Sequence, residues 1–159
     1  MLATELAALF ARDLTRLRQQ IEAFPDTTTL WATAPGVSNA AGTLALHLEG
    51  NLREYIGRQL GHLEYRRDRP AEFSTRAVAR DELAARADAL REEIPAVIAG
   101  LSDAELASTY PEEVLGVPMS NRQFLIHLSG HLNYHLGQID YLRRISTGNG
   151  AIPLAGLMA

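Results

Sequence analysis

The alternation of hydrophobic and polar residues divides the 159-residue chain into four long segments. Apolar residues recur every three or four positions in each segment, which is the spacing that places them on one face of an α-helix. The predicted helices cover about 3–24, 41–65, 80–100 and 120–146. Amphipathic helices of this length bury their apolar faces by packing against one another. The pattern therefore predicts an all-α fold, a single-domain four-helix bundle over residues 1–159.

The connections between these helices carry residues that interrupt regular structure. Residues 66–75 are rich in Arg and contain Pro70, and we interpret them as a solvated linker. Pro95 falls inside the third helix and is expected to kink it or to end it early, because proline removes a backbone donor and clashes with the preceding turn. The tail, residues 148–159, is rich in Gly and Ala, and we expect it to pack loosely or to contact a partner.

The apolar stripe of the last helix is interrupted by three polar residues, His131, His135 and Gln138. An unpaired buried polar group costs about 1–3 kcal/mol, so the protein must contain something that satisfies these side chains. A bound metal ion is the simplest answer, and the interruption therefore predicts a metal site. The full stripe advances by alternate steps of four and three residues through Phe124, Leu128, His131, His135, Gln138, Leu142 and Ile145.

His131 and His135 lie one helical turn apart, about 6 Å along the helix axis, so their imidazoles can reach the same ion. A third ligand must come from a neighbouring helix, as in other bundle metal sites. His47 is the best candidate, because the start of the second helix lies beside the latter half of the last helix if the two run antiparallel. Asn51 follows His47 one turn later on the same side. His62 lies about 22 Å further along the same helix and requires a different register.

A further histidine offers an alternative pairing. His127 lies four residues before His131, but it is about 12 Å from His135 along the axis, so His127 and His135 cannot share one ion. On a helical wheel, His131 and His135 fall near the centre of the stripe, whereas His127 falls on its flank. We therefore favour the inner pair and place His127 at the edge of the pocket.

Composition excludes several classes of function. A net charge of −4 gives no basic surface for nucleic acid. All 15 basic residues are Arg, which excludes Schiff-base chemistry and a phosphate-binding P-loop, because both need Lys. The chain has no Cys, hence no disulfide, no thiolate nucleophile and no Cys-ligated zinc. The start has the pattern of a helix rather than of a signal peptide, and no apolar run approaches the roughly 18 residues that span a membrane. We expect a cytoplasmic protein.

Two stretches of the sequence are similar to a known family. FLIHLSGHLNYHLGQIDYLRR, residues 124–144, resembles the last helix of the DinB/YfiT-like family of metal-binding four-helix bundles. LALHLEGNLREYIG, residues 44–57, resembles the second helix of that family. The resemblance implies an up-down-down-up bundle, metal ligands at His47, His131 and His135, and a homodimer. Some members transfer a low-molecular-weight thiol to an electrophile or isomerise a substrate with its help, and many have no known reaction.

Three neutral imidazoles leave at least one position on the ion open, which is typical of a catalytic site. Nitrogen ligands suit Zn²⁺, Ni²⁺, Co²⁺ or Cu²⁺, of which we expect Zn²⁺ or Ni²⁺. Because the chain lacks Cys, thiol chemistry would need a low-molecular-weight thiol as cosubstrate. The residues expected to orient a ligand imidazole or to line the pocket are Asn51, Gln138, His127, Tyr55 and Tyr134.

Three functions fit this site. The first is a metal-dependent enzyme in which the ion activates a small thiol for transfer to an electrophilic small-molecule substrate. The second is a metal-dependent hydrolase with an ion-activated water, which needs a base; Glu49 and Glu54 qualify only if they turn inward, and the helical wheel points Glu49 toward solvent. The third is a non-catalytic metal-binding bundle that acts as a dimer. We expect a homodimer, supported by Ile126 on the outer side of the last helix, and no nucleic-acid or membrane partner.

Overall fold

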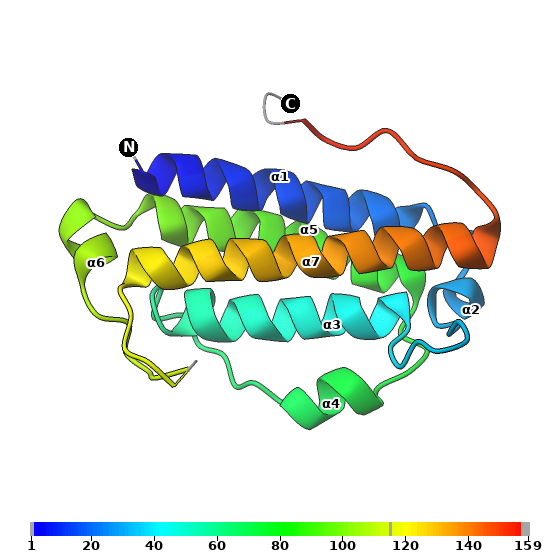
Figure 1. Cartoon of the computed structure of the whole chain (residues 1–159), viewed down its shortest axis with the longest axis horizontal. Helices are drawn as coiled ribbons and strands as arrows, with labels where there is room; N and C mark the ends of the chain where they lie inside the picture. The colour runs from blue at the N-terminus through cyan, green and yellow to red at the C-terminus, as the bar shows by residue number, and fades with distance from the viewer. Residues whose placement is uncertain (1, 115, 157–159) are drawn as a thin grey trace.

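Four long helices make up most of the chain in the computed structural model, which describes residues 2–114 and 116–156 (Figure 1). Three shorter helices lie in the connections between them, and a π-helical stretch continues the second long helix. The elements are α1 (Leu2–Glu22), α2 (Thr27–Leu30), α3 (Ala41–Leu52), η1 (Arg53–Arg58), α4 (Arg69–Ser74), α5 (Arg80–Ala99), α6 (Asp103–Ala107) and α7 (Asn121–Thr147). The prediction of an all-α bundle is confirmed.

The order of the helices follows the up-down-down-up scheme. In Figure 1, α1 and α7 run in one direction, and α3 and α5 run in the other. Because α3 and α5 point the same way, the chain must travel back along the length of the bundle between them. Figure 1 shows this return segment, with α4 in its middle, passing outside α3. The connection that follows η1 therefore lies against the bundle as an extra layer.

The buried face of α7 is centred on Leu132 and Ile139, both fully buried, rather than on the predicted stripe. Ile145, which the stripe included, is 62% exposed, and His131 and His135 are only partly buried. The stripe is therefore confirmed at Phe124, Leu128 and Leu142 and wrong at Ile145, and its histidines lie at the edge of the buried face. The physical reason is that α7 packs against both α1 and α3, so its buried face is wider than a single seam, and the histidines lie at its α3 side.

The second long helix ends earlier than predicted. It was expected to reach residue 65, but regular structure stops at Arg58, after a π-turn in which the amide of Gln59 donates to the carbonyl of Glu54. His62 follows with a left-handed backbone at φ 53°, so it has left the helix and is exposed. A π-turn at the end of a helix shifts the direction of the side chains after it. His62 is thereby removed from the helix face that His47 occupies.

The two prolines lie inside helices, Pro70 at the start of α4 and Pro95 within α5. Pro70 lies in the first turn of α4, where its missing N–H is not needed, and Asp68 caps this helix by accepting from the amide of Ala71 at 3.0 Å. Residues 66–75 are therefore not simply a solvated linker. Pro95 lies inside α5 and does not end it early, because the helix continues to Ala99.

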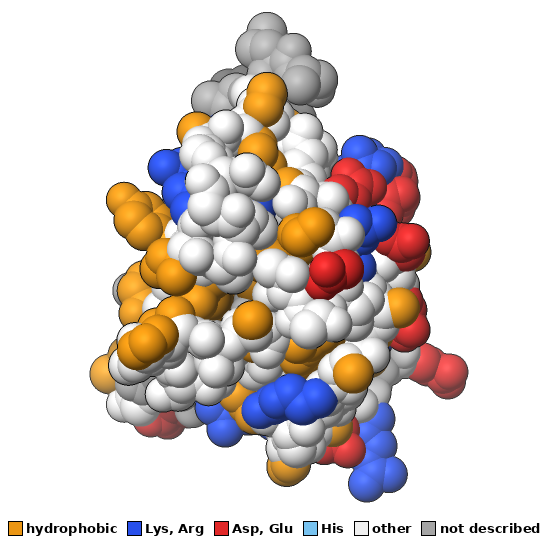
Figure 2. All heavy atoms as spheres, turned by 90° about the vertical axis from the view of Figure 1, so that its right-hand side faces the viewer, with side chains coloured by type: hydrophobic (Ala, Val, Ile, Leu, Met, Phe, Trp, Pro, Cys, Tyr) orange, Lys and Arg blue, Asp and Glu red, His pale blue; other side chains and the backbone are white. Residues whose placement is uncertain are grey.

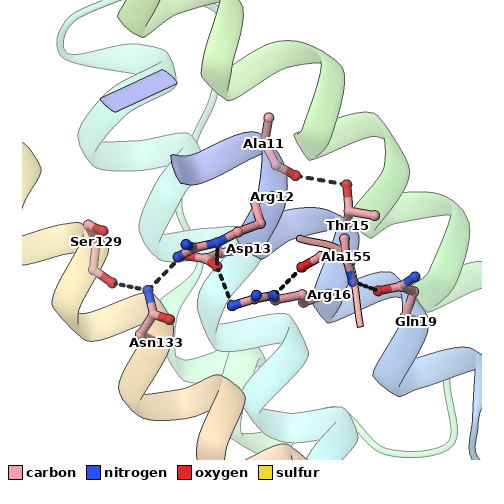
Figure 3. Close-up of polar contacts among 9 residues, drawn as sticks. All are labelled: Ala11, Arg12, Asp13, Thr15, Arg16, Gln19, Ser129, Asn133 and Ala155. Carbon is pink, nitrogen blue, oxygen red and sulfur yellow. Dashed lines mark hydrogen bonds and ion pairs between the residues drawn. The ribbon is translucent and has the colours of Figure 1, made fainter. Parts of the chain in front are cut away.

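A polar network joins α1, α7 and the C-terminal segment (Figure 3). The fully buried carboxylate of Asp13 accepts hydrogen bonds from Arg12 at 2.7 Å and from Asn133 of α7 at 2.7 Å. Arg16 donates to the carbonyl of Ala155 at 2.7 Å, and the amide of Ala155 donates to Gln19 at 2.9 Å. These contacts hold the described part of the tail along α1.

Among the described helices, none combines the length and the apolar character needed to cross a membrane.

The buried face of α7 can be tested by a pair of substitutions. Leu132→Ala removes a fully buried side chain, so we expect it to lower the free energy of unfolding by about 2–5 kcal/mol. Ile145→Ala, at a position that is 62% exposed, is expected to change it by less than about 0.5 kcal/mol. Urea denaturation of both variants measures the difference, and a larger loss for Ile145→Ala than for Leu132→Ala would return Ile145 to the buried face.

Candidate metal site

Three imidazole rings converge between α3 and α7. The Nε2 atom of His131 lies 3.3 Å from Nε2 of His47 and 3.1 Å from Nε2 of His135. One ligand nitrogen from each of the three rings lies within 4.8 Å of the other two. His47 is buried, whereas His131 and His135 are partly exposed, so the cluster lies at the surface of the bundle rather than at its centre.

The helices bring these rings together by register and direction. His131 and His135 project from consecutive turns of α7, a helix that Ser120 caps at its start and Gly148 ends in the left-handed conformation. α3 runs antiparallel to α7, so its first half lies beside the second half of α7 (Figure 1). This arrangement places His47 opposite His131 and His135, as predicted from the sequence for two antiparallel helices.

The second ring nitrogen of each histidine has a different environment. Nδ1 of His47 lies 3.0 Å from Oε2 of Glu72, and Nδ1 of His135 lies 2.7 Å from Oε1 of Gln138. Nδ1 of His131 is buried and has no hydrogen-bond partner in the described residues. A carboxylate and an amide oxygen only accept hydrogen bonds. Nδ1 of His47 and Nδ1 of His135 therefore donate these hydrogen bonds, and Nε2 of each ring faces the cluster.

Glu72 comes from α4, the short helix of the return segment. Its carboxylate is 6% exposed and accepts two further hydrogen bonds, from Nε of Arg67 at 2.6 Å and from Nη2 of Arg67 at 2.9 Å. Burial acts to raise the pKa of Glu72, but the hydrogen bonds from His47 and Arg67 outweigh it and lower the pKa below its usual value. Glu72 is therefore an ionised carboxylate. Phe73, the next residue, packs its ring against that of His47 at 5.1 Å.

The imidazoles of α7 are neutral near pH 7. Burial lowers the pKa of His131 from 6.5 to about 4, and the neighbouring His135 and His47 lower it further in the same direction. Burial also lowers the pKa of His135, against the opposing effect of the hydrogen bond to Gln138. A neutral imidazole is the form that ligates metal.

The arrangement fits a divalent metal ion. Nε2 of His131 faces Nε2 of both other rings, and Nδ1 of His131 has no hydrogen-bond partner in the described residues. With metal–nitrogen distances of about 2.0–2.1 Å, two ligand nitrogens of a tetrahedral site lie roughly 3.3 Å apart. Two of the three separations, 3.1 and 3.3 Å from Nε2 of His131, match this value, and all three lie within 4.8 Å. His47, His131 and His135 would hold the ion.

The residues predicted to surround the site lie at different distances from the cluster. Gln138 bonds directly to His135, and the ring of Tyr134, although 65% exposed, contacts the ring of His135 at 5.2 Å. Asn51 is buried one turn after His47, and its Oδ1 has no partner in the described residues. The other two predicted residues do not bond to the cluster. They are Tyr55, which packs against Phe124 and beneath Arg67, and His127, which is exposed and stacks on Phe124.

Sequence reasoning missed Glu72 and Arg67, because it treated their segment as solvent-exposed. Two local signals were present. First, Asp68 followed by Pro70 is typical of the start of a helix. Second, Gly50 lies in the interior of α3, where glycine is unfavourable and therefore needs a structural reason. A Cβ atom on Gly50 would lie 2.0 Å from Oε1 of Glu72, so glycine leaves the room that the carboxylate occupies. Glu49 also differs from its prediction, because it pairs with Arg53 and Arg86 instead of pointing to solvent.

The comparisons with known proteins agree with this fold. A model of the DinB superfamily matches residues 9–139. In structure, the chain is similar to a DinB-like protein from Bacillus cereus, with a TM-score of 0.67, 20% sequence identity, and coverage of 89% of this chain and 91% of that chain. No curated protein matches the sequence. The protein belongs to the DinB superfamily.

The lowered pKa of His131 predicts how the stability of the metal-free protein depends on pH. Between pH 6.5 and about pH 4, an unfolded chain binds a proton at this residue and the folded chain does not, so stability falls as the pH falls through this range. We expect His131→Gln to reduce that loss. Urea denaturation in the presence of a chelator at several pH values measures it. An equal pH dependence in both proteins would contradict the prediction.

Proposed function

We propose that the protein is a metal-dependent enzyme that uses His47, His131 and His135 to bind Zn²⁺ or Ni²⁺ and activates a low-molecular-weight thiol for transfer to an electrophilic small molecule. The observation that carries the proposal is the cluster of three histidines whose ligand nitrogens lie within 4.8 Å of one another, with Nε2 of His131 close to Nε2 of both other rings. A divalent ion held by neutral ligands keeps its full charge, and when bound it stabilises an incoming thiolate. The chain supplies no thiol of its own, since it has no Cys.

The state of the nearby carboxylates favours thiol chemistry over hydrolysis. Hydrolysis needs a group that accepts a proton from the attacking water. Glu72, whose carboxylate bonds to the cluster, is engaged by His47 and Arg67, and Glu54 is engaged by Arg58. A thiol of low pKa needs no such base once an ion stabilises its thiolate. The hydrolase therefore ranks second, and a bundle without catalysis ranks third.

Two surface grooves give room for small molecules; each includes one residue that bonds to the cluster or to Glu72, but none of the three cluster histidines lines either groove. One, of about 380 Å³, contains Gln138, which bonds to His135, and is otherwise uncharged; its walls include Leu44, Tyr141 and Ile145. The other, of about 470 Å³, contains Arg67 and Tyr55 together with further charged side chains. The uncharged groove suits an apolar electrophile, and the charged groove suits a polar cosubstrate.

Metal content and thiol binding test this function. We expect tag-free protein purified without chelator to contain nearly one equivalent of metal by mass spectrometry, and His47→Ala, His131→Ala and His135→Ala to lose it, because two imidazoles bind an ion far more weakly than three. The loaded protein should then bind a small thiol and accelerate its reaction with a chromogenic aryl halide, and the three variants should do neither.

His62→Ala is the matched control, since His62 is exposed and lies outside the cluster. It should keep the metal and the thiol-dependent rate. A loaded protein that hydrolyses esters or amides without thiol would support the hydrolase instead. A wild-type protein that refuses added Zn²⁺ and Ni²⁺ would refute every metal-dependent function.

We further propose that the protein forms a homodimer through the outer face of α7. This face is uncharged and exposed along the helix, and it includes two glycines that let another helix approach closely. Figure 2 views the end of the bundle at which α7 ends, and hydrophobic side chains lie mainly on its left whereas acidic side chains gather on its right. The outer face consists of Ile126, Gly130, Tyr134, Gly137, Tyr141 and Ile145.

A cytoplasmic location also stays a prediction.

Charge substitutions test the dimer. Ile126→Glu places a carboxylate on the outer face of α7, so we expect it to convert a dimer to a monomer in sedimentation velocity, because a buried unpaired charge opposes association. Val117→Glu is the matched control, since Val117 is 54% exposed, as Ile126 is 55% exposed, but lies outside α7. A monomeric wild-type protein at all accessible concentrations would contradict the proposal.

A further inference from the structure

The three histidines of the cluster differ in the hydrogen-bond partner of their second ring nitrogen, Nδ1. His47 donates to the carboxylate of Glu72, His135 donates to the neutral amide of Gln138, and His131 has no partner in the described residues. A hydrogen bond to an ionised acceptor is stronger than one to a neutral acceptor. The imidazole of His47 is therefore the most strongly oriented of the three, and it should be the best electron donor toward an ion.

Glu72 reaches His47 at the cost of burying a carboxylate. Its side chain is 6% exposed and lies on α4, which packs against α3 from outside the four-helix core. Burying a carboxylate is unfavourable unless strong partners compensate it. Here the partners are His47 on one oxygen and Arg67 on both, so the carboxylate joins the return segment to the cluster.

Arg67 holds Glu72 in one orientation. Its Nε donates to Oε1 and its Nη2 donates to Oε2, which is the fork geometry in which a guanidinium fixes a carboxylate plane. Oε2 is shared with Nδ1 of His47. Arg67 itself packs over the ring of Tyr55, with 5.4 Å from its guanidinium carbon to the ring centroid. The chain Tyr55, Arg67, Glu72 and His47 is therefore fixed along its length.

α3 is shaped to admit this carboxylate. Gly50 lies three residues after His47, and a Cβ there would lie 2.0 Å from Oε1 and 2.6 Å from Cδ of Glu72. Both distances are well below van der Waals contact. Glycine is unfavourable inside a helix, so its presence at this position is explained by the space that Glu72 fills.

We infer that Glu72, held by Arg67, is a positioning residue of the metal site: it fixes the proton of His47 on Nδ1, orients the ring, and strengthens the bond of Nε2 to the ion. This inference rests on the proposed function only in that a metal must bind. Carboxylate partners of ligand histidines act in this way because they hold the tautomer and increase the basicity of the imidazole. The segment that connects η1 to α5 thereby controls the metal affinity of a site built on α3 and α7.

The affinity for Zn²⁺ measures the effect directly. We expect Glu72→Gln to weaken Zn²⁺ binding about 10–100-fold in competition with a chromophoric chelator, because the substitution keeps the shape and removes the charge. Gly50→Ala should weaken it as well, since it keeps the carboxylate but displaces it from His47. Glu49→Gln is the matched control: Glu49 is 12% exposed at its side chain and pairs with two arginines, but bonds to no histidine of the cluster.

The tautomer of His47 gives a second readout that needs no metal. In the metal-free wild-type protein, nitrogen NMR of the histidine rings should show His47 protonated at Nδ1, although a free neutral imidazole prefers the proton on Nε2. Gly50→Ala, which displaces the acceptor, should move His47 toward the Nε2 form, whereas Glu49→Gln should not; Glu72→Gln tests the charge alone, because its amide oxygen can still accept from Nδ1. A substitution that only destabilised the fold would not change this tautomer selectively.

The outcomes separate the inference from the proposed function. Wild-type protein that takes no metal refutes the proposed function and, with it, the role of Glu72. Wild-type protein that binds Zn²⁺ but is matched in affinity by Glu72→Gln and by Gly50→Ala overturns the inference alone. Weaker binding in both, with an unchanged Glu49→Gln control and a His47 tautomer that shifts in Gly50→Ala, supports it. If Glu72→Gln does not fold, Gly50→Ala carries the same test.

Discussion

The antiparallel contact of α3 with α7 is the constraint on which the site depends. It brings Nε2 of His47 to 3.3 Å from Nε2 of His131, although the two residues are 84 positions apart in the chain. The same contact requires α3 and α5 to run parallel in an up-down-down-up bundle, and the chain must therefore return along the bundle before α5 begins (Figure 1). The long connection is thus a consequence of the topology, and it passes the outer side of α3 where His47 needs a partner.

The return segment between η1 and α5, which the topology requires, also contributes residues to the site. A cap at Asp68 and a proline in the first turn start α4, and the helix then directs Glu72 inward. The absence of a side chain at Gly50 leaves space for the carboxylate, and Arg67 compensates its burial. Charge is therefore balanced locally: in the described residues, the carboxylate that bonds to the cluster is paired with the guanidinium of Arg67. Such a site leaves the charge of a bound ion available to a substrate.

The sequence allowed much of the bundle to be predicted, and the limits of that prediction are physical. Helical periodicity identifies which residues share a face, but it does not state how wide the buried face is. His131 and His135 were expected at the centre of the core and lie at its edge, because α7 is buried between α1 and α3. The second long helix was predicted to reach residue 65, because local propensity does not reveal the π-turn that ends it at Arg58. Glu72 was missed because the polar composition of its segment resembles that of a solvated linker.

By itself, the sequence determined the four long helices, the absence of Lys and Cys chemistry, and the one-turn spacing that lets His131 and His135 act together. These properties depend on residue type and on neighbours within a few positions, and short-range geometry fixes them. Only the tertiary structure decided that Glu72 bonds to His47, 25 residues away, and that His62 leaves the helix face of His47. Those outcomes depend on how separate helices pack and on where a buried charge finds its partners, which no local pattern of residues contains.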